Sequence, residues 1–464
     1  MQRPFDVDSC SNSAESSAGR WRQWAVRLDV NQAVVFAMLL RGWQMVGGFV
    51  TVLLVSTYLS GDLQGYYFTF TSLIGVQALF DLGFGTISVN LVSHEWAKLD
   101  SDGHDHASAN SRVLARLIEL GQRLFRWYSV AAILFGMTVA GCGTIFFSAQ
   151  QTGSASWHVP WIALVALTSF SLATSPLIAL MEGCNQVASV NRMRLVQAVL
   201  ASVAIWLSVI LGGGLWALVA SAAVRVLCEL TLVAARRRGF FGKFFDVPQR
   251  GFIDWRNEVW PLQWRLGIQA AVGFFSSGLL TPIMFHYHGP TVAGQMGLTW
   301  TVLMAIQQAS LAWIQPRIPR LGMLAARRQF TEMDRLFFHS TIQSLITMAI
   351  AGTVLWSVVS IGRAWGFAVV DRFLETLPLG LLAVTVAVNL VLACQGHYVR
   401  ACKREPFLVL SLVADGSMGL ISWWLGSQFG PTGAISGLLA VSTFVVVPWQ
   451  TAIWRRCRAE SRCS

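Results

Sequence analysis

Long apolar runs separated by short polar connections extend along most of the chain. At a rise of about 1.5 Å per residue, a helix needs about 20 apolar residues to cross the hydrocarbon of a bilayer. The runs predict twelve transmembrane helices, over residues 31–59, 65–92, 128–148, 159–183, 194–212, 215–235, 263–286, 292–314, 336–360, 375–397, 406–427 and 431–453. Because the runs are continuous and not alternating segments of about ten residues, they favour a helical bundle over an outer-membrane barrel.

The overall composition strengthens this prediction. Of the 464 residues, 54% are hydrophobic and only 12% are charged, and the mean hydropathy is +0.55. A soluble domain carries about 25% charged residues, so this chain has too few to cover its surface in water. The composition nearly excludes a soluble globular enzyme and predicts an all-α, polytopic membrane protein.

Basic residues are concentrated on every second connection between the runs. Arginine and lysine gather before the first run and after the second, fourth, sixth, eighth, tenth and twelfth, while the alternate connections hold only Arg363 and Arg372. Cytoplasmic loops carry such an excess of positive charge, so the pattern predicts twelve spans with both termini in the cytoplasm. The same basic face accounts for the net charge of +11, and no nucleic-acid partner is expected.

The two halves of the chain share short features in the same order. Leu180–Gly183 closes the fourth run as Ala393–Gly396 closes the tenth, and Gly65 and Gly294 stand near the starts of the second and eighth. The expected organisation is therefore a duplicated bundle with a cavity between two lobes, as in alternating-access carriers. Its expected parts are a cytoplasmic tail at 1–30 with an interfacial helix over 20–29, a six-helix lobe at 31–238, a cytoplasmic connection at 239–262, a second six-helix lobe at 263–453 and a basic cytoplasmic tail at 454–464.

Charged side chains inside the runs are the strongest candidates for function. An isolated charge at mid-bilayer costs at least about 2.5–3.5 kcal/mol, so such residues need partners or water. Arg41 in the first run and Asp81 in the second lie at similar predicted depths. Two interpretations follow: an ion pair that pins two helices, or a cavity-lining arginine whose electrostatics a carboxylate tunes.

Further polar candidates lie in other runs. Arg225 and Glu229 are four residues apart and share a helix face, which favours an ion pair within the helix. Asp415 has no obvious local partner and is a candidate either for proton coupling or for a structural hydrogen bond. Gln44 and Gln269 suit a cavity or helix-to-helix hydrogen bonds. Arg265 stands near the cytoplasmic start of its run and suits either a cavity or a side chain that extends to the membrane interface.

Motifs of nucleotide hydrolysis, zinc proteolysis and serine hydrolysis are not found. The sequence contains no G-x-x-x-x-G-K-[ST], no H-E-x-x-H and no G-x-S-x-G. His104-Asp105-His106 lies in a loop rich in Ser, Asp and Asn, which is typical of a solvated segment and not of a metal site. We therefore expect no enzymatic activity, no cofactor and no bound metal.

Several short motifs resemble one family of membrane proteins. They are Leu59-Ser-Gly-Asp-Leu-Gln-Gly-Tyr-Tyr-Phe-Thr-Phe70, Ala78-Leu-Phe-Asp-Leu-Gly-Phe-Gly85, Glu182-Gly-Cys-Asn-Gln-Val187 and His397-Tyr-Val-Arg-Ala-Cys-Lys-Arg-Glu-Pro406. Over roughly residues 35–450 the chain resembles bacterial polysaccharide-biosynthesis membrane proteins. These form the O-antigen flippase-like branch of the superfamily that includes multidrug extruders and the lipid II flippase.

The resemblance implies a MATE-like fold of two six-helix lobes around a V-shaped cavity. It also implies a multi-pass protein of the bacterial inner membrane that moves a polyprenyl-pyrophosphate-linked oligosaccharide, a precursor of lipopolysaccharide O-antigen or another polysaccharide, to the periplasmic leaflet. Such flippases use arginines on the first helix of each lobe, and Arg41 and Arg265 match that description. A guanidinium suits this role because its planar donor fork fits phosphate oxygens and stays charged. The implied partners are the lipid-linked glycan, membrane lipids and other polysaccharide assembly proteins.

Two alternatives remain open at the level of sequence. An ion-coupled exporter of small cationic compounds would need an accessible carboxylate, such as Asp81 or Asp415, in its cavity. A non-transporting subunit of a polysaccharide synthesis complex would need no polar cavity between its lobes.

Overall fold

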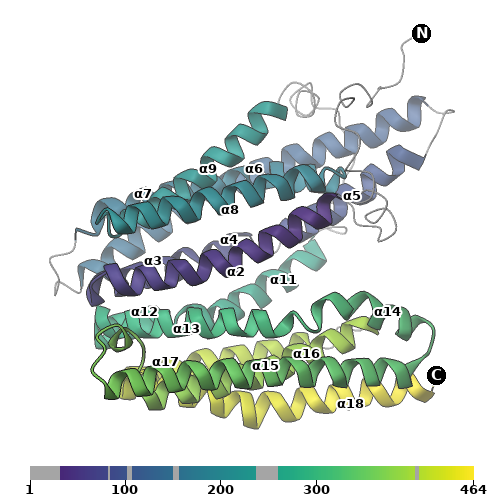
Figure 1. Ribbon diagram of the computed structural model, residues 1–464. Coiled ribbons are helices and arrows are strands. Elements are labelled where there is room, and N and C mark those ends of the chain that lie inside the picture. The colour runs from purple at the N-terminus through teal and green to yellow at the C-terminus, as the bar shows by residue number, and fades with distance from the viewer. Residues whose placement is uncertain are drawn as a thin grey trace, which may run out of the picture.

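The computed structural model describes residues 32–81, 84–101, 107–149, 156–236, 260–402 and 407–463. Within these ranges all regular structure is helical, and the helices form two bundles (Figure 1). The predicted fold class, an all-α membrane protein with two lobes, is confirmed.

The first bundle contains the helices of the amino-terminal half. They are α2 (Gln32–Tyr58), α3 (Gly61–Ile74), α4 (Gln77–Asp81), α5 (Phe84–Ser101), α6 (Ala107–Ser148), α7 (His158–Gly183), α8 (Val187–Ile210) and α9 (Trp216–Arg236). A short break after Ile74 separates α3 from α4 in the second crossing, where the sequence predicted one continuous helix.

The second bundle contains the helices of the carboxyl-terminal half. Its longer elements are α11 (Trp260–Gly273), α12 (Leu280–His288), α13 (Pro290–Leu311), α14 (Ile318–Ala326), α15 (Phe330–Ala364), α16 (Thr376–Ala401), α17 (Leu408–Val441) and α18 (Val447–Cys463). Short π- or 3₁₀-helical turns stand at Phe274–Gly278 (η3), Gln315–Arg317 (η4), Val370–Arg372 (η5) and Ser442–Val446 (η6).

The helices account for the twelve predicted crossings. Among the described residues, eight helical segments are long and apolar enough to span a membrane, and α11 with α12 makes a ninth crossing bent by 42°. The eighth of them, Leu408–Glu460, includes two crossings, because the chain reverses at Gly430 (φ 64°), where Ser422 and the Ala434 carbonyl come within 3.4 Å. The broken crossing α3–α5 and the 22-residue helix α13 complete the set.

Several boundaries differ from the prediction, and each difference lies at a charged helix end. Helix α6 begins at Ala107 and not near residue 128, and its polar first half includes an Arg123–Glu119 ion pair of 2.5 Å. Helix α18 continues to Cys463 through most of the predicted tail 454–464, and α14 was not predicted at all. Hydropathy detects only the part of a helix that crosses hydrocarbon, so polar extensions are missed. The expected tail at 1–30 with its interfacial helix, His104–His106 and most of the connection 239–262 lie outside the described residues.

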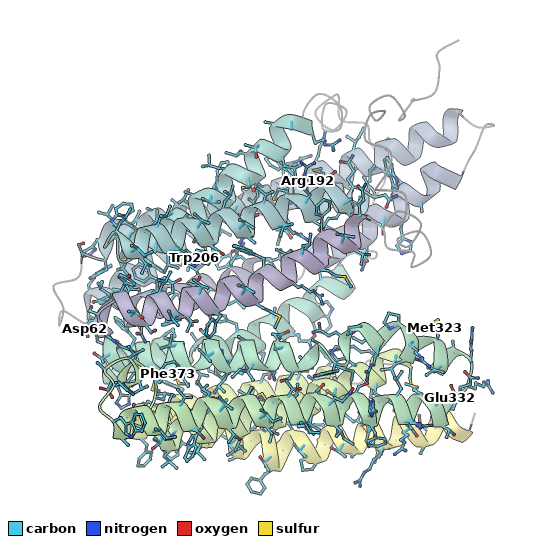
Figure 2. The ribbon with its side chains drawn as sticks, in the orientation of Figure 1. Asp62, Arg192, Trp206, Met323, Glu332 and Phe373 are labelled. Atoms are coloured by element: carbon cyan, nitrogen blue, oxygen red, sulfur yellow. The ribbon has the colours of Figure 1, made fainter. Side chains whose placement is uncertain are left out.

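The two bundles meet where α3 crosses α13. A Cβ atom on Gly65 would lie 1.9 Å from the Pro290 carbonyl oxygen, and one on Gly294 would lie 2.9 Å from the Gly65 amide nitrogen. Only glycine allows this backbone approach, which is typical of helix packing in membranes. The bundles join at the end that carries Asp62 and Phe373 and diverge toward the end that carries Arg192, Met323 and Glu332 (Figure 2).

Candidate functional site

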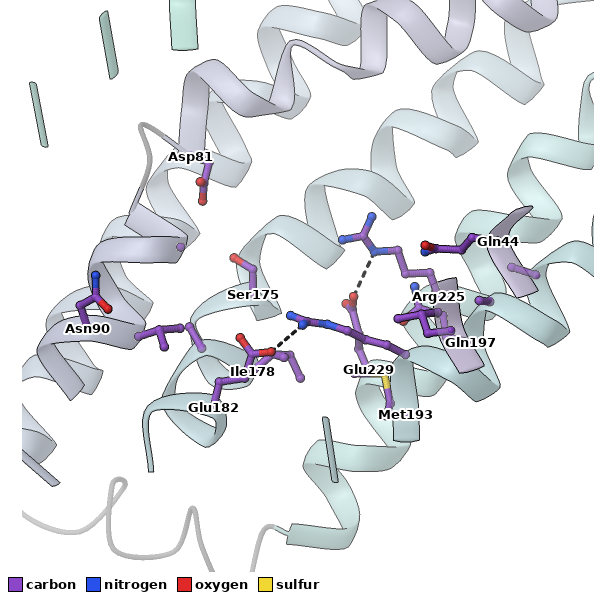
Figure 3. Close-up of a pocket in the computed structure, with 17 residues that line it drawn as sticks. Gln44, Asp81, Asn90, Ser175, Ile178, Glu182, Met193, Gln197, Arg225 and Glu229 are labelled. Carbon is purple, nitrogen blue, oxygen red and sulfur yellow. Dashed lines mark hydrogen bonds and ion pairs between the residues drawn. The ribbon is translucent and has the colours of Figure 1, made fainter. Parts of the chain in front are cut away.

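A polar cavity of about 790 Å³ lies inside the first bundle (Figure 3). Helices α2, α4, α5, α7, α8 and α9 contribute its walls, so the fold brings together residues from most of the amino-terminal half. The described lining residues are Leu40, Gln44, Asp81, Gly85, Val89, Asn90, Ser175, Ile178, Ala179, Glu182, Met193, Arg194, Gln197, Ala198, Ala201, Arg225 and Glu229.

Arg225 and Glu229 form the ion pair that their spacing predicts. The Arg225 Nε donates to Glu229 Oε1 at 3.1 Å, while Ser171 Oγ lies 3.0 and 2.9 Å from the two carboxylate oxygens and Thr174 Oγ1 lies 2.9 Å from Oε2. The Glu229 side chain is 7% exposed and that of Arg225 is 47% exposed. The carboxylate is thus buried and fully bonded, and the guanidinium it anchors is presented to the cavity.

A second ion pair lies nearer the end where the bundles diverge. Arg194 Nη1 is 2.5 Å from Glu182 Oε1, which joins the start of α8 to the end of α7. The sequence did not predict this pair: Glu182 belongs to one of the family-like motifs, and Arg194 to the basic residues that follow the fourth run. The available signal was a carboxylate and an arginine on either side of one helix hairpin, whose antiparallel helices place them together.

Asp81 lines the cavity, but its partner is not Arg41. Tyr128 donates a hydrogen bond of 2.5 Å to Asp81 Oδ1. Arg41 Nη1 donates to Gln315 Oε1 at 3.0 Å, across the space between the two bundles. Within the described chain no ion pair joins Arg41 to Asp81, so the interpretation of a pinning pair is not supported. Arg41 is instead an exposed charge at the junction of the bundles.

The other predicted residues lie in three places. Gln44 lines the first-bundle cavity. Asp415 lines a smaller cavity of about 260 Å³ in the second bundle. Gln269 Nε2 lies 3.5 Å from Ser411 Oγ in the same bundle, at the limit of a hydrogen bond. Arg265 belongs to α11, and its side chain lies outside the described part of the structure.

Polar contacts tie the bundles together at the end where they meet. Gln64 Nε2 donates to the carbonyl oxygens of Gly294 at 2.9 Å and Arg372 at 3.2 Å. Thr291 Oγ1 donates to Asp62 Oδ1 at 2.8 Å, also between the bundles. Within the second bundle, Gln295 Nε2 donates to the Asp371 carbonyl at 2.8 Å and holds the neighbouring turn against α13. We call these side chains and carbonyl groups around α3 and α13 the closed end. The sequence did not predict it, because the contacts between the bundles join residues more than two hundred positions apart.

The chemistry available at these places is ionic and hydrogen-bonding. The cavity presents two guanidinium groups, three carboxylates and the amides of Gln44, Asn90 and Gln197. Among the described residues no cluster of three or more histidine, cysteine or acidic side chains could hold a metal ion. The arrangement is suited to binding a polar group.

No protein-family model and no curated protein sequence matches the chain. Solved structures do match. The chain is similar to "Lipid II flippase MurJ, inward closed conformation", with a TM-score of 0.61 and 11% identity over 93% of this chain and 90% of that one.

Two other structures come from multidrug-type transporters. An inward-facing MATE family transporter of the MOP superfamily matches with a TM-score of 0.55 and 9% identity, over 88% of this chain and 99% of that one. A MOP superfamily transporter from Pyrococcus furiosus, whose structure is described by a "reverse polarity of binding pocket", matches with a TM-score of 0.52 and 12% identity, over 92% and 95%. At these identities the similarity shows a shared fold, that of two-lobed membrane transporters.

Proposed function

We propose that the protein is a flippase that moves a polyprenyl-pyrophosphate-linked oligosaccharide, an O-antigen or polysaccharide precursor, across the bacterial inner membrane by alternating access. The observation that carries the proposal is Arg41, an exposed guanidinium that reaches from one bundle to Gln315 of the other. A charge at this depth of an apolar helix is costly unless it serves a water-filled or ligand-binding space. Pyrophosphate oxygens would replace the single bond to Gln315 with a bidentate, charge-assisted contact.

The orientation follows from the positions of basic residues. The end where the bundles diverge carries Arg192 (Figure 2), with Arg194 two residues further along α8 and Arg320 on α14, the helix that carries Met323. Arg363 donates to the Phe373 carbonyl and the Arg372 carbonyl accepts from Gln64, so both belong to the closed end. By the positive-inside rule the diverging end faces the cytoplasm, and both termini lie there. In this orientation the substrate enters from the cytoplasmic leaflet. Its release to the periplasm requires the closed end to separate as the bundles rock.

Flipping in liposomes tests the proposal. Arg41→Ala should lower the rate of translocation of a polyprenyl-pyrophosphate-linked oligosaccharide by about tenfold or more, because a charge-assisted contact to phosphate contributes about 1.5–3 kcal/mol. Arg335→Ala, an exposed arginine on α15, is the matched control and should leave the rate unchanged. Equal rates for Arg41→Ala and the wild type would remove Arg41 from the mechanism, and no translocation by the wild type would remove the function.

A second candidate function is export of small cationic compounds. The observation in its favour is that three carboxylates, Asp81, Glu182 and Glu229, line the first-bundle cavity while Arg41 is not among the lining residues. Each of these carboxylates already accepts a hydrogen bond or ion pair from the protein, which weakens the candidate. Export of a cationic dye by proteoliposomes, abolished by Asp81→Asn, would establish it instead of the flippase.

The third hypothesis is a subunit of a polysaccharide synthesis complex that transports nothing itself. A lobe interface packed without any polar cavity would favour it, and the polar cavity described above lies inside the first bundle and not between the bundles, so it does not test this hypothesis. Translocation by the purified protein alone would exclude it.

A further inference from the structure

We infer that the first-bundle cavity is a carbohydrate-binding subsite that takes the sugar units next to the pyrophosphate. This inference rests on the proposed function and adds that two separate places bind the two parts of the substrate. Arg41 engages the anionic group, and the cavity recognises the glycan. A volume of about 790 Å³ is within the range of about 300–1,000 Å³ in which proteins enclose small ligands.

The polar lining suits a polyhydroxylated ligand. Side-chain amides at Gln44, Asn90 and Gln197 each offer both donors and an acceptor, and the guanidinium and carboxylate groups add more of each. Sugar hydroxyls also donate and accept at the same atom. With two guanidinium groups against three carboxylates, all of the latter already bonded, the cavity has no strong excess of either charge. The lining therefore suits a neutral polyol better than an anion or a cation, whose charge it would not balance.

Arg225 is the hydrogen-bond donor in this cavity whose orientation is best fixed by its neighbours. Its Nε is fixed by Glu229, and within the described residues its two Nη atoms have no hydrogen-bond partner. Ser171 and Thr174 hold Glu229 in turn, so the direction of the guanidinium is set by three buried partners. Figure 3 shows the Arg225 side chain directed into the cavity. Two Nη groups that are held in one direction and free to donate are what a guanidinium needs to bind a ligand through two hydrogen bonds.

The lining also argues against a flat hydrophobic ligand. No phenylalanine, tyrosine or tryptophan stands among the described residues that line the cavity, although aromatic residues make up 12% of the chain. Ligands recognised by stacking, including planar cationic drugs, need such faces. Recognition in this cavity depends on hydrogen bonds.

The cavity and Arg41 are close enough to serve one molecule. Gln44 lies three residues after Arg41 on α2, and residues at this spacing are neighbours on a helix surface, with Cβ atoms about 5–6 Å apart. Gln44 lines the cavity, while Arg41 reaches toward the other bundle. A sugar attached directly to a pyrophosphate at Arg41 would therefore stand at the cavity entrance.

Binding of two purified probes in detergent tests the inference. One probe is polyprenyl pyrophosphate without sugar, and the other is the same lipid carrying a disaccharide of N-acetylglucosamine. Arg225→Gln and the double variant Gln44→Leu/Gln197→Leu should weaken binding of the sugar-bearing probe by about tenfold and leave the sugar-free probe within about twofold. Arg41→Ala should weaken both probes. Arg225→Lys, which keeps the charge and loses the fork, should behave as Arg225→Gln.

Matched controls come from outside the cavity. Arg236→Gln removes an arginine from the same helix, and Gln329→Leu removes an exposed glutamine at the start of α15, and both should bind the two probes as the wild type does. If the cavity variants bind the sugar-bearing probe as tightly as the wild type, or lose both probes equally, the inference is wrong while the proposed function stands. If the wild type binds neither probe, both are wrong. Size-exclusion profiles identify variants that fail to fold. If Arg225→Gln is one of them, binding of the two probes by Arg225→Lys tests the inference in its place.

Discussion

Glu229 holds its charge inside the first bundle through three neighbours from two helices. Its carboxylate accepts from Arg225 on its own helix and from Ser171 and Thr174 on α7. A buried carboxylate is stable only when its oxygens are bonded, and here both are. The pair therefore positions Arg225 and at the same time fastens α9 to α7.

Replacement of this carboxylate should destabilise the protein. Glu229→Leu leaves the Ser171 hydroxyl and the Arg225 Nε without this acceptor, while the Thr174 hydroxyl keeps its bond to the Ser171 carbonyl. We expect a loss of about 2 kcal/mol in the free energy of unfolding, seen as a lower melting temperature in detergent. Glu229→Gln retains an acceptor oxygen and should lose less. Glu332→Leu, at an exposed position in the first turn of α15, is the control and should change stability by less than about 1 kcal/mol. An equal effect of Glu229→Leu and Glu332→Leu would contradict the account.

For single residues, the sequence predicted which charged side chains need partners inside the membrane better than it predicted those partners. The cost of charge in an apolar run pointed to Arg41 and Asp81, and i,i+4 spacing predicted the Arg225–Glu229 pair. The bond of Asp81 to Tyr128 could not be predicted, because Tyr128 lies 47 residues further along the chain, on α6. A partner on another helix depends on rotation and kinks, which the spacing of residues does not encode.

The last helix shows how polar contacts extend an element beyond the membrane. Arg458 on α18 donates through Nε at 2.9 Å and Nη2 at 2.8 Å to Asp334 of α15, whose other oxygen accepts from Tyr398 of α16 at 2.9 Å. Asp334 is 5% exposed, and the guanidinium also lies 5.4 Å from the Trp454 ring. The sequence predicted a basic tail here, because four arginines follow the apolar run and tertiary contacts are not visible in hydropathy.

Loss of this clamp should free the end of α18. Arg458→Ala leaves the buried Asp334 with the Tyr398 hydroxyl and without its guanidinium, and a loss of about 2–3 kcal/mol is expected. Limited proteolysis should then cut within 454–463, and the melting temperature should fall. Arg455→Ala removes an exposed arginine of the same helix and should alter neither measurement. Identical proteolysis of the two variants would show that the clamp does not hold the helix.

In the whole molecule, two similar halves join at one end and diverge at the other. The twelve apolar runs and the paired positions of Gly65 and Gly294 could be read from the sequence, and the structure places these two glycines against each other where the bundles join. The divergence of the bundles at the other end could not, because it depends on how α3 packs against α13 and not on any local pattern (Figure 1). The alternating access proposed here requires this packing to separate.

A cross-link at the closed end tests that requirement. Asp62 and Thr291 meet there through a hydrogen bond of 2.8 Å, one from each bundle. In the double variant Asp62→Cys/Thr291→Cys, mild oxidation should form a disulfide between α3 and α13, identified by peptide mass spectrometry. Because the closed end could then no longer separate, translocation in liposomes should fall by about tenfold or more and return on reduction. The single variant Asp62→Cys, oxidised in the same way, should keep its rate. Full translocation by the cross-linked protein would mean that the substrate passes without separation of the bundles at α3 and α13.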